Sequence, residues 1–515
     1  MIIILLLLCS SLILLYYYIL HYEKFVRPIN KIPSMPSYPL IGHLLHFWMA
    51  SPEDLWKLIR SMAVTYYPIS NLWLGPIAAV GIRHPDDIEK ILSSTTHHLA
   101  KGYLYKYLHP WLGTGLLTSK GIKWHKRRKI LTPTFHFNIL KQFVEILIKE
   151  GNHLTQSLKN SEGSTIDNLV FFISKHTLNA ICGKSICMHP LFHTHTHTHT
   201  HTHTHIITYR VLRPWLVFDI IFALTSMGKK QNRCLKILHG FTEKIIAERK
   251  KYYECNKGHL ENFADITDDK LDEIDDKQVI GVKKKRLAML DLLISVARDN
   301  EINDLGIREE VDTFIFEGHD TVATGLTFAI LLLAEHKDIQ QRVRDEVNAI
   351  MHANKGKLTM SALNDMSYLE RCLKESLRLY PSVPYVMRSV SEDVNLHSYL
   401  IPSGTLLYIG IQEVHRDSNF WPNPEVFDPD RFLPDKIQNR HPYSYIPFSG
   451  GPRNCIGQRF AMLEMKAMIA PLIYNFYLEP VDYLKDLRFK VDIINRTVDP
   501  IRIRYIPVDQ TQSTL

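Results

Sequence analysis

Apolar residues recur at intervals of three and four along most of the chain, which is the spacing that gives a helix one buried face. Runs of β-branched and aromatic residues are shorter and fewer. The predicted helices are Leu55–Met62, Leu140–Leu158, Cys234–Tyr252, Ile307–His336, Leu369–Leu379 and Arg459–Phe476. The predicted strands are Ile77–Ile82, Val394–Leu396, Thr405–Ile411 and Ile501–Tyr505. We therefore expect a mainly α fold with small β-sheets and find no domain boundary within residues 41–515.

The N-terminal segment differs from the rest because residues 2–20 carry no charge. A run of this length can cross a bilayer as one helix. The nearest basic residues follow the run, which favours a single-pass anchor over a cleaved signal peptide and places the body in the cytoplasm. We expect an anchor over residues 1–22, an extended proline-rich linker over 23–40, and one globular domain over 41–515.

Composition narrows the class of protein without identifying it. Hydrophobic residues make up 45% and charged residues 22%, which excludes a disordered, collagen-like or polytopic membrane protein. A net charge of +8 is too dilute to indicate nucleic acid, but it suits an anionic membrane or an acidic partner. The 7 cysteines contain no CxxC pair and predict reduced cytosolic thiols. No phosphate loop, dinucleotide fingerprint or nucleophile elbow is present, so we expect no nucleotide or flavin site.

Residues 193–205 differ in composition from the rest of the chain, because they alternate His and Thr throughout. A metal-binding tract is one interpretation. In an extended strand, however, the histidines would share a face at about 7 Å spacing, which is too wide for one ion. A CA dinucleotide repeat read in frame also spells His-Thr. We favour this origin, which predicts a disordered insert.

The strongest chemical signal is F-S-G-G-P-R-N-C-I-G at residues 448–457, followed by a helical pattern from Gln458. Cys455 therefore precedes a helix N-terminus, whose dipole and N–H groups favour a thiolate. The glycines allow the loop to approach a flat cofactor, and Arg453 supplies a cation. A nucleophile would need a nearby base, and zinc would need further ligands. A single thiolate ligand to haem iron remains, and a merely structural cysteine would not account for the surrounding residues.

This loop resembles the haem-binding loop of the cytochromes P-450, F-x-x-G-x-R-x-C-x-G, at every defined position. The resemblance covers about residues 30–510, and it implies the cytochrome P-450 haem-thiolate fold. It also implies haem b (iron protoporphyrin IX) as cofactor, with Cys455 as the iron ligand. The other residues that it assigns to haem binding are Trp124, Arg128, Arg388, Phe448 and Arg453. Glu375 and Arg378, an i, i+3 pair in K-E-S-L-R, would form a buried ionic triad with Arg431.

Polar residues interrupt the long apolar helix predicted over 307–336. Glu317, Asp320, Thr321 and Thr324 fall at i, i+3, i+4 and i+7, so they form one stripe. The segment E-G-H-D-T resembles the oxygen-activation motif of the family, which implies that Thr321 and Asp320 are catalytic and steer protons to dioxygen. Glu317 and the stretch 124–137 resemble family four, whose members hydroxylate fatty acids at or near the terminal methyl. Many of them carry an ester between this glutamate and a haem methyl, so we predict the same link, and a catalytic role, for Glu317.

We therefore expect a monooxygenase anchored on the cytosolic face of the endoplasmic reticulum, acting on fatty-acid-like lipids. Its partners would be membrane lipid and a flavoprotein reductase that supplies electrons from NADPH. The predicted docking residues for the reductase are Lys126, Arg127, Lys129 and Arg459. Two alternatives stay open. One is a reductase-independent haem isomerase or dehydratase, and the other is an inactive haem-binding product in which the His–Thr tract disrupts the substrate side.

Overall fold

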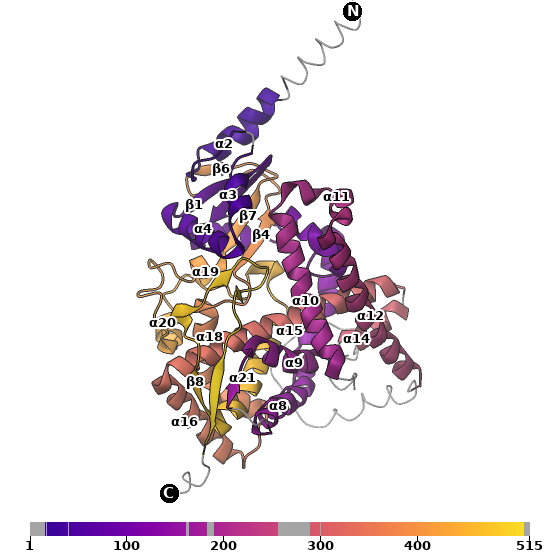
Figure 1. The fold of residues 1–515 in the computed structure, drawn as a ribbon, viewed down its shortest axis with the longest axis vertical. Helices are drawn as coiled ribbons and strands as arrows, with labels where there is room; N and C mark the ends of the chain where they lie inside the picture. Colours follow the sequence, from indigo (N-terminus) through magenta and orange to yellow (C-terminus); the bar gives the residue numbers. More distant parts are fainter. Residues whose placement is uncertain are drawn as a thin grey trace, which may run out of the picture.

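A computed structural model describes residues 16, 18–39, 41–160, 164–182, 190–255, 289–298 and 300–508. Within them helices form most of the body, and small sheets lie at its edges (Figure 1). The predicted mainly α fold with small sheets is confirmed. All six predicted helices and all four predicted strands are present, with ends shifted by at most eight residues.

The helices of eight residues or more are α4 (Pro52–Thr65), α5 (Pro85–Leu92), α7 (Gly121–Leu131), α8 (Phe137–Lys159), α9 (Leu169–Cys182), α10 (Pro190–Val211), α12 (Ser226–Cys255), α14 (Met289–Arg298), α15 (Asp304–Glu335), α16 (Lys337–Ala353), α18 (Ser367–Leu379) and α21 (Gln458–Asn475). Shorter helices that matter for the site are α2 (Arg27–Asn30), α3 (Leu44–Met49), η2 (Tyr103–Leu108), α6 (His109–Leu112), η5 (Pro214–Val217), α11 (Asp219–Leu224) and η6 (Pro429–Phe432).

The largest sheet has the strand order β1 (Ile69–Leu74), β2 (Ile77–Ile82), β7 (Leu406–Gly410), β4 (Tyr385–Ser389). Strands β2 and β7 pair in parallel, and the other neighbours are antiparallel, with Val386 opposite Ile409. A second sheet joins β3 (Thr165–Ile166), β11 (Ile503–Pro507) and β8 (Phe476–Pro480). Two hairpins complete the strands, β5 (Val394–Leu396) with β6 (Tyr399–Ile401), and β9 (Phe489–Lys490) with β10 (Arg496–Thr497).

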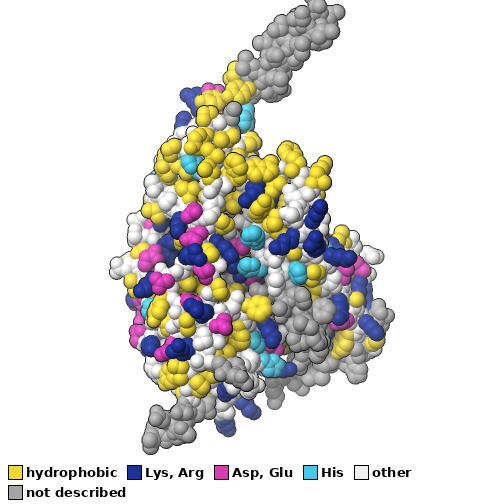
Figure 2. Space-filling model, viewed as in Figure 1, with side chains coloured by type: hydrophobic (Ala, Val, Ile, Leu, Met, Phe, Trp, Pro, Cys, Tyr) yellow, Lys and Arg dark blue, Asp and Glu magenta, His cyan; other side chains and the backbone are white. Residues whose placement is uncertain are grey.

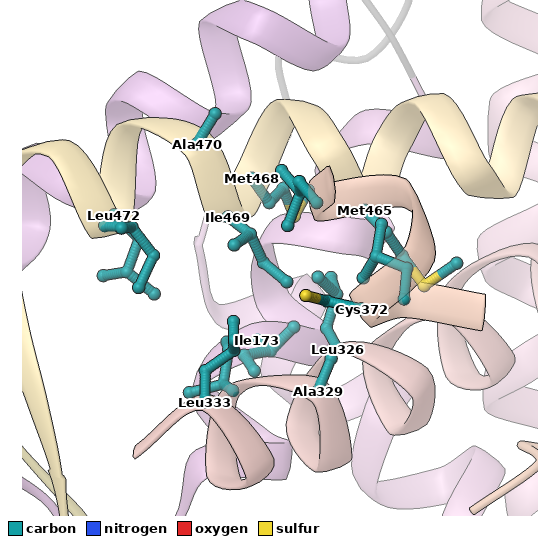
Figure 3. Packing of buried hydrophobic residues seen from close by; sticks show 14 of the residues in the cluster. Ile173, Leu326, Ala329, Leu333, Cys372, Met465, Met468, Ile469, Ala470 and Leu472 are labelled. Carbon is teal, nitrogen blue, oxygen red and sulfur yellow. The ribbon is translucent and has the colours of Figure 1, made fainter. Parts of the chain in front are cut away.

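Helix α15 runs through the middle of the body and organises the core (Figure 1). It begins at an N-cap, Asn303, whose side chain accepts a hydrogen bond from the Gly306 N–H at 2.9 Å. Its apolar residues surround the helix axis, as expected of a helix that is buried on all sides. Leu326 and Leu333 of α15 face Ile469 of α21, with Ile173 of α9 beside them (Figure 3). This packing fixes α15 relative to the loop that precedes α21.

Two expectations about irregular segments are wrong. The first part of the proposed linker is helical, because residues 22–30 continue a helix and Pro28 sits in the first turn of α2, where proline is tolerated. The His–Thr tract lies within α10 and is therefore not a disordered insert. Apolar residues that follow it, such as Ile206 and Ile207, are buried, and this tertiary packing outweighs the modest helix propensity of His and Thr.

The proposed anchor cannot be compared with the structure, because most of residues 2–20 lie outside the described part of the chain. Among the described residues, no helix combines the length and the apolar character needed to cross a bilayer.

Candidate active site

A cavity of about 250 Å³ separates α15 from the loop that carries Cys455. Its α15 wall includes Phe316, Glu317 and Thr321, and the opposite wall runs from Pro447 to Ala461. The remaining walls come from segments far apart in the sequence. They include Lys101, Tyr105, Leu108, Trp124, Arg128, Ile181, Val383, Val386, Ile411, Ile493 and Ile494. Most of these side chains are apolar, so the cavity suits a largely hydrophobic ligand with a few polar contacts.

The cysteine loop is held by its own backbone and by α7. The Cys455 N–H donates to the Phe448 carbonyl at 2.9 Å, and Arg128 donates to the backbone and side-chain oxygens of Asn454 at 2.9 and 2.7 Å. Gly451 has φ +64°, and a Cβ there would lie 1.7 Å from the Leu92 carbonyl oxygen, so no other residue fits. The loop therefore has little freedom in where it places the Cys455 sulfur.

The chain alone does not stabilise a thiolate at Cys455. Burial raises the pKa of the thiol to about 11, and the negative charge of Glu317 adds to this effect. The Gly457 N–H, Arg128 and Lys101 oppose it but do not outweigh it. The Gly457 N–H at the N-terminus of α21 favours the thiolate, and burial of the sulfur is the larger influence on its pKa in the chain alone. Coordination to a cation is what deprotonates a thiol in such a site.

Four basic side chains lie in or beside the cavity, and two of them, Arg388 and Arg453, are buried. Lys101, Arg128 and Arg453 line it, and Arg388 lies close enough to lower the pKa of both Lys101 and Arg453. Within the described residues, none of these four has a carboxylate within 4.0 Å. Arg388 Nη2 and Arg453 Nε are buried without a hydrogen-bond partner. The site therefore has room for anionic groups that the chain does not supply.

Lys101 is the residue of this cluster that sequence reasoning missed. It precedes η2 in an aromatic stretch with no clear period, so only its place before the Trp124 motif could have drawn attention to it. Burial, with Arg388 and Arg453 nearby, lowers the pKa of Lys101 well below its usual range. Trp124, as predicted, shares the site with Arg453, whose guanidinium stacks on its ring at 4.1 Å.

The polar stripe on α15 divides between two environments. Glu317 and Thr321 line the cavity, and the Thr321 hydroxyl donates to the Glu317 carbonyl. Asp320 does not line it, is fully buried, and forms an ion pair with Arg496 of β10. Thr324 is also buried away from the cavity and donates to the Asp320 carbonyl at 2.9 Å. Sequence reasoning placed the four residues together but missed Arg496, which lies 176 positions beyond Asp320.

Glu317 is a carboxyl group in balance between its two charge states. Burial raises its pKa to about 7, although Lys101 and Arg128 favour the ionised form. A carboxyl group at this position can therefore exchange protons near neutral pH.

The three members of the predicted ionic triad meet behind the cysteine loop. Arg378 donates two hydrogen bonds to the Glu375 carboxylate, at 2.7 and 2.8 Å, and Arg431 Nε lies 3.2 Å from the same group. Arg378 also donates to the backbone carbonyls of His415 and Pro424, which precede η6. The triad thus ties α18 to the segment that leads into the cysteine loop.

One of the four proposed docking residues does not lie at the surface. Lys126, Lys129 and Arg459 are exposed, but Arg127 is buried and lies 3.5 Å from the Glu310 carboxylate. Arg127 is therefore wrong as a docking residue, because α7 turns it toward α15.

The donor set fits an iron porphyrin. One sulfur faces an apolar cavity, and several cations without carboxylate partners suit the two propionates of such a group. Phe448, Cys455, Trp124, Arg128 and Arg453 would hold it. The described residues contain no cluster of three or more His, Cys, Asp or Glu that could hold a metal ion in another way.

Comparison with known proteins agrees with this site. The family model described as Cytochrome P450 matches residues 32–497. The chain is 40% identical over 486 residues to Cytochrome P450 4c21 of Blattella germanica, covering 93% of this chain and 94% of that protein. It is 38% identical to Cytochrome P450 4c3 of Drosophila melanogaster and 37% identical to Cytochrome P450 4V2 of Mus musculus. Both of these alignments cover 94% of this chain and 91% of the relative.

Proposed function

Because the chain belongs to the cytochrome P450 family and is a monooxygenase, we propose that it hydroxylates fatty acids or related lipids at or near the terminal methyl. The observation that carries the proposal is the apolar character of the cavity walls outside the Cys455 loop. Leu108, Phe316, Val383, Ile493 and Ile494 contribute to these walls. An alkyl chain end is the part of a lipid that such a wall would bind.

The side chains around the cavity would have different roles in the proposed reaction. Haem b held by Cys455, when bound, supplies the activation of dioxygen with electrons passed from NADPH by a flavoprotein reductase. The Thr321 hydroxyl would hold a proton donor at the α15 wall, and Asp320 would be the acid that recharges it. Lys126, Lys129 and Arg459 are exposed cations that would meet an acidic face of the reductase.

The test is turnover of a lipid panel by the full-length protein with a reconstituted NADPH-dependent reductase. We expect saturated and unsaturated fatty acids to yield products oxidised at the terminal or adjacent carbon. Products oxidised only near the carboxyl group would contradict the proposed orientation. Conversion of lipid peroxides without NADPH would instead support an isomerase or dehydratase.

We also propose that Glu317 is the residue of an ester link to haem. Its carboxyl group lines the cavity, and its pKa of about 7 lets it react as an acid or as an anion. Acid extraction separates haem that is held covalently from haem that is not. We expect the haem to stay with the unmodified chain and to leave the Glu317→Gln variant. Complete extraction from both would rule out the link.

A membrane location in the endoplasmic reticulum is supported by an apolar surface beside the N-terminal helix. Hydrophobic side chains gather at the end of the body from which that helix projects (Figure 2). On α11, Ile220 is 80% exposed and Leu224 77% exposed, and Met49 of α3 is 78% exposed. Trp48 of α3 and Trp215 of η5, which precedes α11, lie 5.3 Å apart between ring centroids. Contiguous apolar patches on the solvent-exposed surface of a protein are unusual, and they indicate a site of contact with lipid or with another protein.

Tryptophan fluorescence in vesicles with brominated acyl chains tests this surface. We expect quenching that falls in the Trp48→Phe and Trp215→Phe variants. A Trp421→Phe variant is the control, since Trp421 is fully buried. Equal quenching in all of these variants would exclude the surface from the membrane.

A further inference from the structure

Asp320 forms an ion pair with Arg496, a residue that belongs to none of the sequence motifs described above. Its carboxylate is fully buried on α15, and Arg496 of the β9–β10 hairpin donates from Nη2 to Asp320 Oδ2. The two side chains are 1% and 4% exposed. Thr321, the next residue along α15, lines the cavity, whereas Asp320 does not. In this arrangement the acid and the hydroxyl are adjacent in sequence but are not presented to the same space.

Arg496 also serves a second carboxylate. Asp492 lies four residues earlier in the same hairpin and is buried, and the charge of Arg496 favours its ionised form. Arg496 Nε and Nη1 are buried without a hydrogen-bond partner, so the guanidinium retains donors that another acceptor could use. One buried cation thus faces two buried acids, and the contacts seen here favour Asp320.

The same hairpin connects the cavity to the His–Thr tract. Ile493 and Ile494, between the two charged residues, line the cavity. Thr204 of α10 lies 3.5 Å from Asp492 Oδ2, as a hydrogen-bond donor. A shift of α10 or of the cavity wall therefore acts on Asp492, and through Arg496 on Asp320.

We propose that Arg496 is a positioning residue for Asp320, which it holds as an ion away from the cavity until the guanidinium moves toward Asp492. Once released, the Asp320 carboxylate takes up a proton supplied by bulk solvent, passes it toward the Thr321 hydroxyl, and returns to its ionised form, so the net change is one solvent proton moved to the α15 wall of the cavity. The inference rests on the proposed function, in which Asp320 handles protons. The other charged or titratable groups that face this pair are His319 on α15, His201 on α10 and Lys490 on β9.

The experiment compares Arg496→Met and Arg496→Lys with the unmodified full-length holoprotein. Removal of the cation would leave Asp320 buried without its ion-pair partner, so we expect a protonated carboxyl band at neutral pH in Arg496→Met. Isotope-edited infrared spectra detect this band, and its loss in the additional Asp320→Asn variant assigns it. The Arg496→Lys variant should keep Asp320 ionised, because it retains the charge. Arg502→Met is the matched control, since it breaks an exposed ion pair with Asp482 in the same C-terminal region.

Turnover provides the second readout. With NADPH and reductase, we expect Arg496→Met to lose roughly tenfold or more of its product per NADPH oxidised, because proton delivery is mistimed. Peroxide-driven turnover should change little, because peroxide already carries the required protons. The pH profile of the NADPH-driven rate should shift in Arg496→Met and not in Arg502→Met.

An Asp492→Asn variant separates the two carboxylates. It removes the alternative partner, so we expect slower NADPH-driven turnover with Asp320 still ionised in the infrared spectrum. Parallel loss of haem, NADPH-driven and peroxide-driven activity in Arg496→Met would show a purely structural role and overturn the inference. An unchanged infrared spectrum in Arg496→Met would overturn it as well. If the unmodified protein turns over no lipid, the proposed function fails, and the infrared comparison still decides how Arg496 acts on Asp320.

Discussion

The cysteine side of the cavity and the α15 side are built in different ways. The first comes from one short loop, in which backbone hydrogen bonds and Gly451 fix the position of Cys455. The second is assembled from α15, η2, β4 and the β9–β10 hairpin, which meet only in the folded chain. The first side can therefore be read as a motif, whereas the second depends on which distant segments pack against α15.

The two sides of the cavity also differ in how far neighbouring cations offset the burial of acidic side chains. Behind the cysteine loop, two arginines share one buried carboxylate: burial raises the pKa of Glu375, and Arg378 and Arg431 oppose this effect. Around α15, several buried acids retain a raised pKa, about 7 for Glu310, Asp312 and Glu317, because burial outweighs their partners. The cysteine side is thus a rigid support, and the α15 side keeps groups that can change charge.

The largest effect is expected from Cys455→Ser. A hydroxyl does not replace a thiolate as an iron ligand, so we expect the reduced protein to lose the carbon-monoxide difference band typical of thiolate-ligated haem. The matched control is Cys255→Ser, since Cys255 is exposed on α12. A thiolate-type band that survives in Cys455→Ser would remove the basis for the cysteine side of the comparison.

The next effect concerns the support behind the loop. Glu375→Ala leaves Arg378 buried without its carboxylate, which we expect to lower the free energy of unfolding by about 3–5 kcal/mol. Glu248→Ala on α12 removes an exposed ion pair with Lys244 and should cost under about 1 kcal/mol. Denaturant unfolding of the two variants measures both. Equal losses would mean that the triad is no more than a surface-type ion pair.

A smaller effect is expected from acid. His415 Nε2 accepts from the Ile446 N–H at 2.8 Å, so Nδ1 carries the proton and donates to the Arg378 carbonyl at 3.2 Å. Burial, with Arg378 nearby, lowers the pKa of His415 to about 3 from its ordinary 6.5. The unfolded chain therefore binds this proton more readily, and the stability contributed by neutral His415 is complete above pH 6.5 and is lost as the pH falls.

We expect a loss of about 2 kcal/mol between pH 6.5 and 5 from this residue. Buried acids with a raised pKa, such as Glu310, change stability in the opposite direction. The measurement is therefore a difference in pH slope between the unmodified protein and His415→Asn. His352→Asn, at an exposed position on α16, is the control. An identical slope in all three proteins would contradict the assignment.

The smallest effect probes the cation cluster on the α15 side. Lys101→Met should weaken haem binding about tenfold, by the loss of one charge-assisted contact of ~1.5 kcal/mol. Transfer of haem to an acceptor protein measures this in a Glu317→Gln background, where an ester cannot hold the haem. Lys106→Met is the control because Lys106 is exposed on η2. Equal haem transfer from the Lys101→Met and Lys106→Met variants would show that Arg388 and Arg453 hold the haem without Lys101.

Features that depend on neighbouring residues could be predicted from the order of amino acids. The period of apolar positions gave α15 and α21, and the ten residues around Cys455 gave the loop, because a helix face and a tight loop are both local. The i, i+3 spacing also placed Glu375 beside Arg378.

The distant residues that complete each group are known from the folded chain. Folding joined Arg496 to Asp320 and brought Lys101 into the cavity, and it turned Arg127 inward to Glu310. It also made the His–Thr tract part of a helix and raised the pKa of Cys455 against the effect of the helix terminus. Burial is the common physical reason, because the cost of desolvating a group depends on everything packed around it and not on its place in the chain.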